Sequence, residues 1–92
     1  MNRCLKMVIK ADKWESRWSS DIQKQAKKLE IEGLMQALDD YQMRIMVCGK
    51  DEKLDDFIDY LYDFFISVDA SIDELEPFIK ERDYRGIFRV IT

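Results

Sequence analysis

The chain has 92 residues, which is the length of one small domain, and we expect residues 1–92 to fold as a single unit. Hydrophobic residues account for 47% of the sequence and charged residues for 37%, a balance typical of globular rather than disordered proteins. The net charge of −4 argues against binding to nucleic acid or to an anionic membrane surface, because both require a cationic face.

The residue types that are missing narrow the chemistry further. The sequence has no histidine and two cysteines, which excludes most zinc sites and all histidine-dependent catalysis, so we expect neither a metal nor a cofactor. No apolar run approaches the roughly 20 residues of a membrane-spanning helix, and residues 1–10 lack a small-residue cleavage site. These features predict a cytoplasmic protein.

The N-terminal third predicts a strand followed by a helix. Residues 3–10 alternate between apolar and polar side chains, which is typical of a half-buried strand. The helix is predicted to begin at Ser20, because a serine followed three residues later by Gln23 fits a capping box. The apolar face of this helix is predicted to consist of Ile22, Ala26 and Leu29.

The middle of the chain predicts a hairpin and a second helix. Residues 34–49 read as two strands with Asp39 and Asp40 at the turn. Residues 51–65 show the clearest helical periodicity. The side chains expected to face the core are Leu54, Phe57, Ile58, Leu61 and Phe64. The aromatic side chains expected off that stripe are Tyr60, Tyr62 and Phe65, which either widen the core contact or form a small surface patch for a partner.

The C-terminal part contains one ambiguous segment and one clear strand. Residues 71–78 show no clean alternation, and Pro77 opposes a helix, whereas residues 86–92 predict a strand. The resulting order is β-α-β-β-α-(β)-β. It predicts a ferredoxin-like α/β sandwich, in which two helices cover one face of an antiparallel sheet of four to five strands.

The sequence from Ala26 to Gly49, AKKLEIEGLMQALDDYQMRIMVCG, resembles the acylphosphatase family. It carries the L-x-I/L-x-G turn of that family as Leu29, Ile31 and Gly33, followed by the hairpin and a strand that ends in glycine. The resemblance extends over nearly the whole chain, and it implies that residues 70–78 form the fourth strand.

Acylphosphatases hydrolyse carboxyl-phosphate bonds without a metal. A glycine-rich loop holds the phosphate with backbone N–H groups, an arginine at the head of the first helix clamps it, and an asparagine on the second strand positions water. The resemblance places Ser19 at the arginine position and Ala37 at the asparagine position, and the loop at residues 11–19 has no glycine. We therefore interpret Lys13, Arg17, Ser19 and Ala37 as a vestigial phosphate loop with no catalytic residue.

Two functions follow from this interpretation. The first is a catalytically inactive acylphosphatase-like domain that acts as a small cytoplasmic binding module. Its partner would be an unidentified protein or a small anion, with no nucleic acid or membrane involved, and the chain would be a monomer or a weak homo-oligomer. The second is a weak acylphosphatase in which Arg17 and Gln36 act from displaced positions.

Two side-chain questions stay open at this stage. Cys4 and Cys48 fall on neighbouring strands, on the face away from the helices, and are either joined by a disulfide or present as two reduced thiols. Trp14 is either an exposed contact residue or part of the core. Trp18 is expected to pack under the first helix. Strands one and three show no aromatic residue on the open face, which argues against RNA binding.

Overall fold

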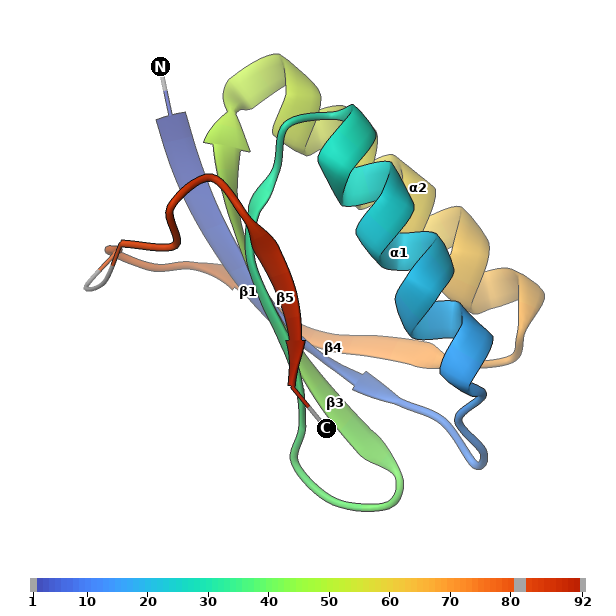
Figure 1. Cartoon of the computed structure of the whole chain (residues 1–92). Coiled ribbons are helices and arrows are strands. Elements are labelled where there is room, and N and C mark those ends of the chain that lie inside the picture. The colour runs from blue at the N-terminus through green and yellow to red at the C-terminus, as the bar shows by residue number, and fades with distance from the viewer. Residues whose placement is uncertain (1, 81–82, 92) are drawn as a thin grey trace.

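The computed structural model describes residues 2–80 and 83–91, which form a layer of two helices on one face of a sheet (Figure 1). The strands are β1 (Asn2–Lys10), β2 (Glu32–Ala37), β3 (Gln42–Lys50), β4 (Ser71–Pro77) and β5 (Phe88–Ile91), and the helices are α1 (Ser16–Lys28) and α2 (Asp51–Ser67). The strand order is β4-β1-β3-β2-β5. The ferredoxin-like architecture predicted from the sequence is confirmed.

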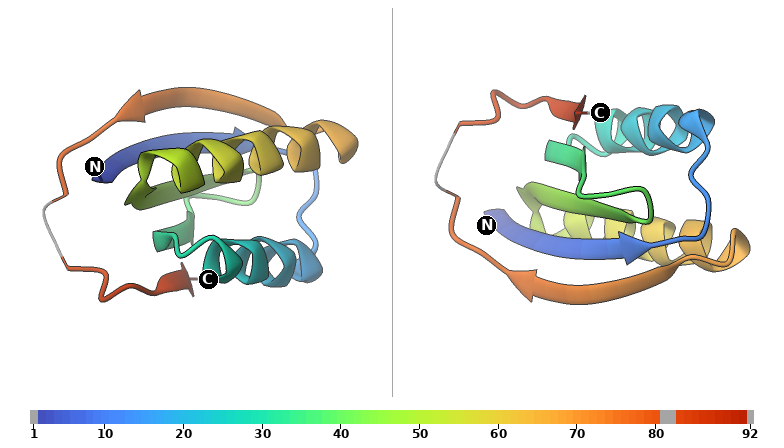
Figure 2. Two further views of the ribbon diagram at one scale, coloured as in Figure 1. Left: turned by 90° about the horizontal axis from the view of Figure 1, so that it is seen from above. Right: turned by 90° about the horizontal axis from the view of Figure 1, so that it is seen from below.

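The sheet is mixed, and the prediction of a purely antiparallel sheet is wrong. β1 pairs antiparallel with β3 and β4, and β2 pairs antiparallel with β3. β5 instead runs parallel to β2, with Gly33 opposite Phe88. The direction of β5 is set by its connection to β4, which passes from one edge of the sheet to the other (Figure 2). Because of that crossing, β5 begins at the same end of the sheet as β2.

α1 begins one turn earlier than the sequence predicts. Glu15 is its N-terminal cap residue and makes no side-chain capping bond, so Ser20 lies inside the helix and the predicted capping box is wrong. The reason is Trp18, which is buried and extends the apolar face of Ile22 and Ala26 toward the N-terminus at four-residue spacing. Burying that indole stabilises the extra turn more than a serine cap would, since a cap contributes about 1 kcal/mol.

α2 packs its apolar stripe onto the sheet. The residues that it buries are Leu54, Phe57, Leu61 and Phe65. Phe65, which was expected beside the stripe, is completely buried, so of its two expected roles it takes the one that widens the core contact. Phe64 is only half-buried and packs edge-on against Trp18 of α1, with ring centroids 6.0 Å apart. The two phenylalanines therefore divide the contacts of α2 between the sheet and its neighbouring helix.

The β2–β3 hairpin turns at residues 38–41, close to the predicted Asp39 and Asp40. Oδ1 of Asp39 accepts the backbone N–H of Tyr41 at 2.8 Å, which closes a side-chain turn. At the other end of β2, Gly33 has a φ of +144°, and a Cβ added there would lie 1.8 Å from the carbonyl oxygen of Met46. Glycine is therefore required for this close approach of β2 to β3.

Residues 71–77 form the edge strand β4, as the family resemblance predicts. Its pairing with β1 is interrupted by a register shift between Lys6 and Val8, and Glu74 has a positive φ of 54°. Pro77 is tolerated opposite Leu5 because one side of an edge strand makes no ladder hydrogen bonds. The local propensity was ambiguous because a bulged edge strand does not show regular alternation.

Residues 78–80 and 83–87, which connect β4 to β5, pack on the sheet face opposite to the helices. Phe78 and Tyr84 of this connection contact a second apolar cluster there. The cluster members on the strands are Cys4, Leu34, Met46 and Cys48. The connection thus adds aromatic side chains to a face on which β1 and β3 provide none. Within the described residues, neither helix combines the length and apolar character needed to cross a membrane.

Candidate functional site

The predicted site lies at the end of the sheet where β1 leads into α1. The backbone N–H of Ala11 donates to the carbonyl oxygen of Tyr41 at 3.0 Å, which holds the β1–α1 loop against the β2–β3 turn. Ala37 is the last residue of β2 at this end, and Ser19 lies in the first part of α1. The structure therefore places both positions at one end of the fold.

The backbone of the β1–α1 loop does not form an anion cradle. Backbone cradles for phosphate combine successive N–H groups through residues in the left-handed region. The residues that adopt a positive φ in the described structure are Glu30, Gly33, Asp69, Glu74, Arg85 and Gly86. None of these belongs to residues 11–15, so the loop keeps ordinary right-handed or extended conformations.

The charges around this loop also disfavour an anion. A small concavity of about 190 Å³ is lined by Asp12, Lys13, Glu15, Trp18, Val68 and Asp69. One ammonium group there faces three carboxylates, so the local field repels a phosphate. Arg17 is engaged with its neighbour, since its Nε donates to Oε2 of Glu15 at 2.8 Å. Lys13 and Arg17, the two cations of the predicted site, are thus offset by nearby acidic side chains.

Gln36, the expected displaced substitute for the family's asparagine, is hydrogen-bonded away from the predicted site. Its Oε1 accepts a hydrogen bond from Nη2 of Arg44 on β3 at 2.7 Å. Both side chains line a groove on the sheet face opposite to the helices. The structure therefore does not bring Gln36 and Arg17 together.

The tryptophans of this region are packing residues. Trp14 is half-buried and contacts the main core, with its ring centroid 5.1 Å from that of Trp18 and 6.0 Å from that of Phe65. The indole Nε1–H of Trp14 is buried without an acceptor among the described residues. Of the two interpretations left open for Trp14, core packing is the one that the structure shows.

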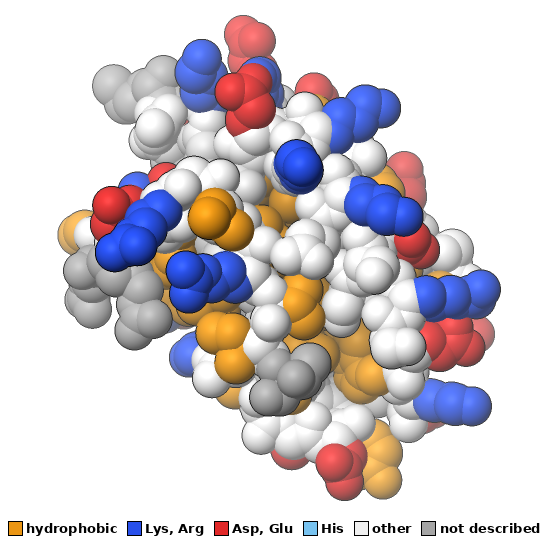
Figure 3. All heavy atoms as spheres, in the orientation of Figure 1, with side chains coloured by type: hydrophobic (Ala, Val, Ile, Leu, Met, Phe, Trp, Pro, Cys, Tyr) orange, Lys and Arg blue, Asp and Glu red, His pale blue; other side chains and the backbone are white. Residues whose placement is uncertain are grey.

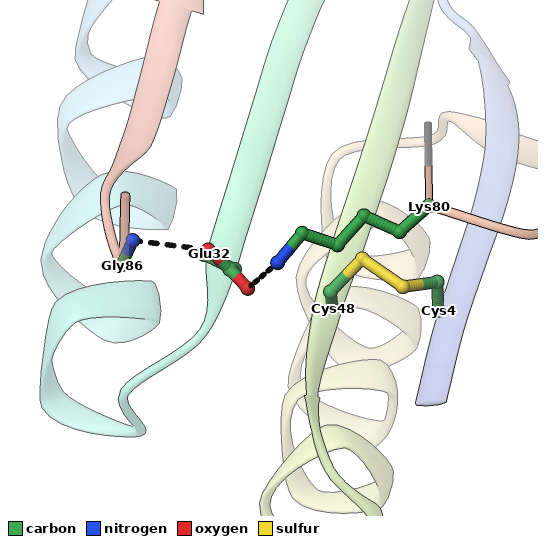
Figure 4. The surroundings of a disulfide bond; sticks show 5 residues. All are labelled: Cys4, Glu32, Cys48, Lys80 and Gly86. Carbon is green, nitrogen blue, oxygen red and sulfur yellow. Dashed lines mark hydrogen bonds and ion pairs between the residues drawn. A yellow bond between two sulfur atoms is a disulfide. The ribbon is translucent and has the colours of Figure 1, made fainter. Parts of the chain in front are cut away.

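The two cysteines occupy directly opposite positions on β1 and β3. Cys4 pairs with Cys48 in the strand register, their Cα atoms are 4.1 Å apart, and a disulfide joins them (Figure 4). Beside this bond, the carboxylate of Glu32 accepts hydrogen bonds from Nζ of Lys80 at 2.7 Å and from the backbone N–H of Gly86 at 3.0 Å. Glu32 therefore fixes both ends of the β4–β5 connection.

Two larger grooves lie away from the vestigial loop. One, of about 720 Å³, runs between α1 and β5, where apolar Ile31, Ile87 and Phe88 are bordered by Lys24 and Lys27 (Figure 3). The other, of about 640 Å³, lies on the open face of the sheet. Among the residues that the structure describes, no three His, Cys, Asp or Glu side chains are arranged to bind a metal ion.

The open-face groove contains residues that the sequence did not single out. They include Arg44 on the central strand and the aromatic side chains of Phe78 and Tyr84. The only signal in the sequence was an arginine at an outward position of a strand, which is ordinarily a solvated residue. The wall that turns this surface into a groove comes from the β4–β5 connection, about 35 residues further along the chain.

No family model matches the chain, and no curated protein matches it. Solved structures do. An acylphosphatase from Coxiella burnetii superimposes with a TM-score of 0.73 and 16% identity over 97% of this chain and 92% of that one. An acylphosphatase from Bacillus subtilis superimposes with a TM-score of 0.68 and 14% identity over 100% of this chain and 99% of that one. HypF from T. kodakarensis superimposes with a TM-score of 0.74 and 18% identity, and the match covers 100% of this chain and 12% of that one. The chain therefore has an acylphosphatase-like fold.

Proposed function

We propose that this acylphosphatase-like domain is a noncatalytic binding module. The proposal rests on two residues at the end of the sheet where β1 leads into α1. By the family resemblance, Ser19 stands at the position of the phosphate-clamping arginine and Ala37 at that of the water-positioning asparagine. A hydroxyl cannot clamp a phosphate in the bidentate way of a guanidinium, and a methyl group cannot orient water. Loss of one such donor lowers a rate by roughly 10²–10³, and here both are absent.

The surroundings of Ser19 supply no replacement for these groups. Arg17 is paired with Glu15, and Gln36 is bonded to Arg44 on the opposite face of the sheet. Hydrolysis by displaced residues would require both contacts to break and both side chains to converge on one phosphate. The acidic lining of the neighbouring concavity adds repulsion between the site and an anionic substrate.

Hydrolysis of benzoyl phosphate by the purified chain tests the proposal. We expect a rate equal to the buffer background, with the Bacillus subtilis acylphosphatase as a positive control in the same assay. Arg17→Ala removes the one displaced arginine, and Arg3→Ala is the matched control, because Arg3 pairs with Asp51 and Asp55 of α2 instead. A rate above background that disappears in Arg17→Ala and persists in Arg3→Ala would contradict the proposal.

Titration with inorganic phosphate, followed by backbone amide NMR, tests the binding capacity of the same loop. We expect no saturable shifts at residues 11–19, because the loop has no left-handed residues and its charges are offset. Saturable shifts confined to these amides would show that the phosphate cradle survives. In that case the loop would remain a candidate catalytic site in spite of Ser19 and Ala37.

A further inference from the structure

We infer that the open face of the sheet binds a small amphipathic monoanion, a molecule with a flat or branched apolar body and a single carboxylate or sulfonate group. This gives the proposed binding module its ligand class and in that respect rests on the proposed function. The site is the groove of about 640 Å³ bounded by β1, β2, β3 and the β4–β5 connection. That volume lies within the range of about 300–1,000 Å³ typical of small-molecule sites.

Arg44 is the anchor of this site. It lies on the central strand β3, opposite Val8 on one side and Gln36 on the other. Gln36 holds the guanidinium through one Nη, and the Nε–H is buried without an acceptor. None of the ion pairs between described residues includes Arg44. A half-buried guanidinium with unused donors and no ion-pair partner among the described residues is complementary to a bound anion.

The neighbouring charges favour one negative charge over two. Lys6 also lines the groove, but its Nζ is paired with Oε1 of Glu76 at 3.3 Å. Glu74 and Glu76 border an adjoining concavity that shares Lys6 and Arg44 with the groove. Lys6 is therefore neutralised by Glu76, and only the charge of Arg44 is left to balance a bound group, which favours one negative charge over two.

The wall of the groove selects an apolar body. Phe78, Ile79 and Tyr84 come from the β4–β5 connection, and Ile91 comes from β5. Ile79 is 87% exposed and Ile91 40% exposed, so both leave apolar surface open at the groove. A ligand that covers these side chains while its charged group reaches Arg44 removes that surface from water.

The groove is held in shape before any ligand arrives. Glu32 binds Lys80 and Gly86 at the two ends of the connection, and the Cys4–Cys48 disulfide lies beneath it (Figure 4). Tyr84 is buried against the same cluster of residues. Ordering costs on binding are correspondingly small, which favours affinity for a small ligand.

Fluorescence titration with 8-anilinonaphthalene-1-sulfonate tests the inference, because this probe is an apolar monoanion. N-phenyl-1-naphthylamine has the same ring system without the charge and is the neutral comparison. We expect saturable binding of one sulfonate probe per chain. Arg44→Met should weaken it about ten- to hundredfold, as expected for a charge-assisted hydrogen bond, and should change the affinity for the neutral probe far less. Methionine keeps the apolar volume of the arginine stem.

Arg3→Met is the matched control, since it removes the same charge on the helix side of β1 and should leave the affinity for the sulfonate probe within about twofold of the original. Near-UV circular dichroism of each variant checks that the probe is not reporting a loosened fold. Amide NMR of the unaltered protein with the same probe provides a measurement that needs no variant. We expect the largest shifts at residues 34–36, 44–46, 78–79 and 84.

Three results would overturn the inference. The first is that Arg44→Met binds the sulfonate probe with the same affinity as the original chain. The second is that the probe shifts only the NMR signals of the groove between α1 and β5. The third is that the sulfonate probe shows no saturable binding. These results are independent of the hydrolysis assay. Benzoyl phosphate hydrolysis together with probe binding at Arg44 would reject the noncatalytic proposal and keep this site, whereas absence of both would reject the site alone.

Discussion

Reduction of the Cys4–Cys48 disulfide is expected to lower the free energy of unfolding by about 4 kcal/mol. The two cysteines are 44 residues apart in the sequence, so the bond closes a long loop in the unfolded chain. In the chain-entropy model a loop of this length removes about 13 cal/mol/K from the unfolded state, which is about 4 kcal/mol at 298 K. For a domain whose total stability is about 5–14 kcal/mol, this is a large share.

The folded state should change little on reduction. The β1–β3 register already places the two residues opposite each other, and Cys48 is buried in one cluster with Tyr84, so we expect this packing to persist without the bond. The effect therefore appears as a lower urea midpoint with intact near-UV circular dichroism. Fluorescence of Trp14 and Trp18, which pack together in the folded protein, follows the transition.

The assay compares oxidised protein with the same protein in the presence of a phosphine reductant. A Cys4→Ser, Cys48→Ser double variant is the control, because its urea midpoint should not respond to the reductant. Thiol titration of unfolded, unreduced protein gives the number of bonded cysteines directly. Two free thiols, or identical midpoints with and without reductant, would refute the reasoning. The bond in the structure argues against the cytoplasmic location predicted from the sequence, because thiols in the cytoplasm are kept reduced.

Two further perturbations follow from the fold. Gly33→Ala should lower the free energy of unfolding by about 3 kcal/mol or more, because the new Cβ collides with the carbonyl oxygen of Met46. Gly86→Ala should lower it by only about 1 kcal/mol, because the space around Gly86 is open and only its φ of +68° is unfavourable for alanine. Equal urea midpoints for the two variants would contradict this expectation. Hydrogen bonding to Glu32 raises the pKa of Lys80 above its ordinary value of 10.5, so this contact stabilises the fold below pH 10.5 and loses its effect as the pH rises through the raised pKa. The difference in stability between the original chain and Lys80→Met should therefore stay constant up to about pH 10 and shrink as the pH rises further, and a difference in urea unfolding that is unchanged over this whole range would count against it.

Periodicity predicted the regular elements because each of them buries one face. Residues 3–10 alternate and form β1, and the helical spacing of residues 51–65 lies within α2. The errors occurred where tertiary packing outweighed a local signal. Ser20 is a good cap residue, yet burial of Trp18 moved the start of α1 to Ser16.

Strand direction and loop path could not be predicted from local patterns. The sequence of β5 is compatible with either direction, and its parallel pairing with β2 depends on where the preceding connection crosses the sheet. The same limitation hid the open-face groove. Arg44 looked like a solvated strand residue, because the side chains that enclose it, Phe78 and Tyr84, are distant in sequence.

The interpretation of residues 11–19 as a vestigial phosphate loop rests on the family resemblance alone. The register of Leu29, Ile31 and Gly33 is what assigns Ser19 and Ala37 to the positions that carry the chemistry in acylphosphatases. Residue composition alone would have suggested the opposite, since residues 13–20 contain two cations and two tryptophans at a helix start. The pairing of Arg17 with Glu15 could not be read from that composition.

The edges of the sheet determine how this domain can associate with other chains. On β4 the register shift and Pro77 interrupt the outer row of backbone groups, and on β5 the side-chain amide of Gln23 from α1 donates to the carbonyl oxygen of Phe88 at 2.9 Å. Neither edge offers a continuous template for a further strand, which protects the chain from fibrillar stacking. Any oligomer or complex would then form through side-chain contacts and not through backbone pairing of edge strands. Single surface substitutions could therefore dissociate such a complex without unfolding either partner.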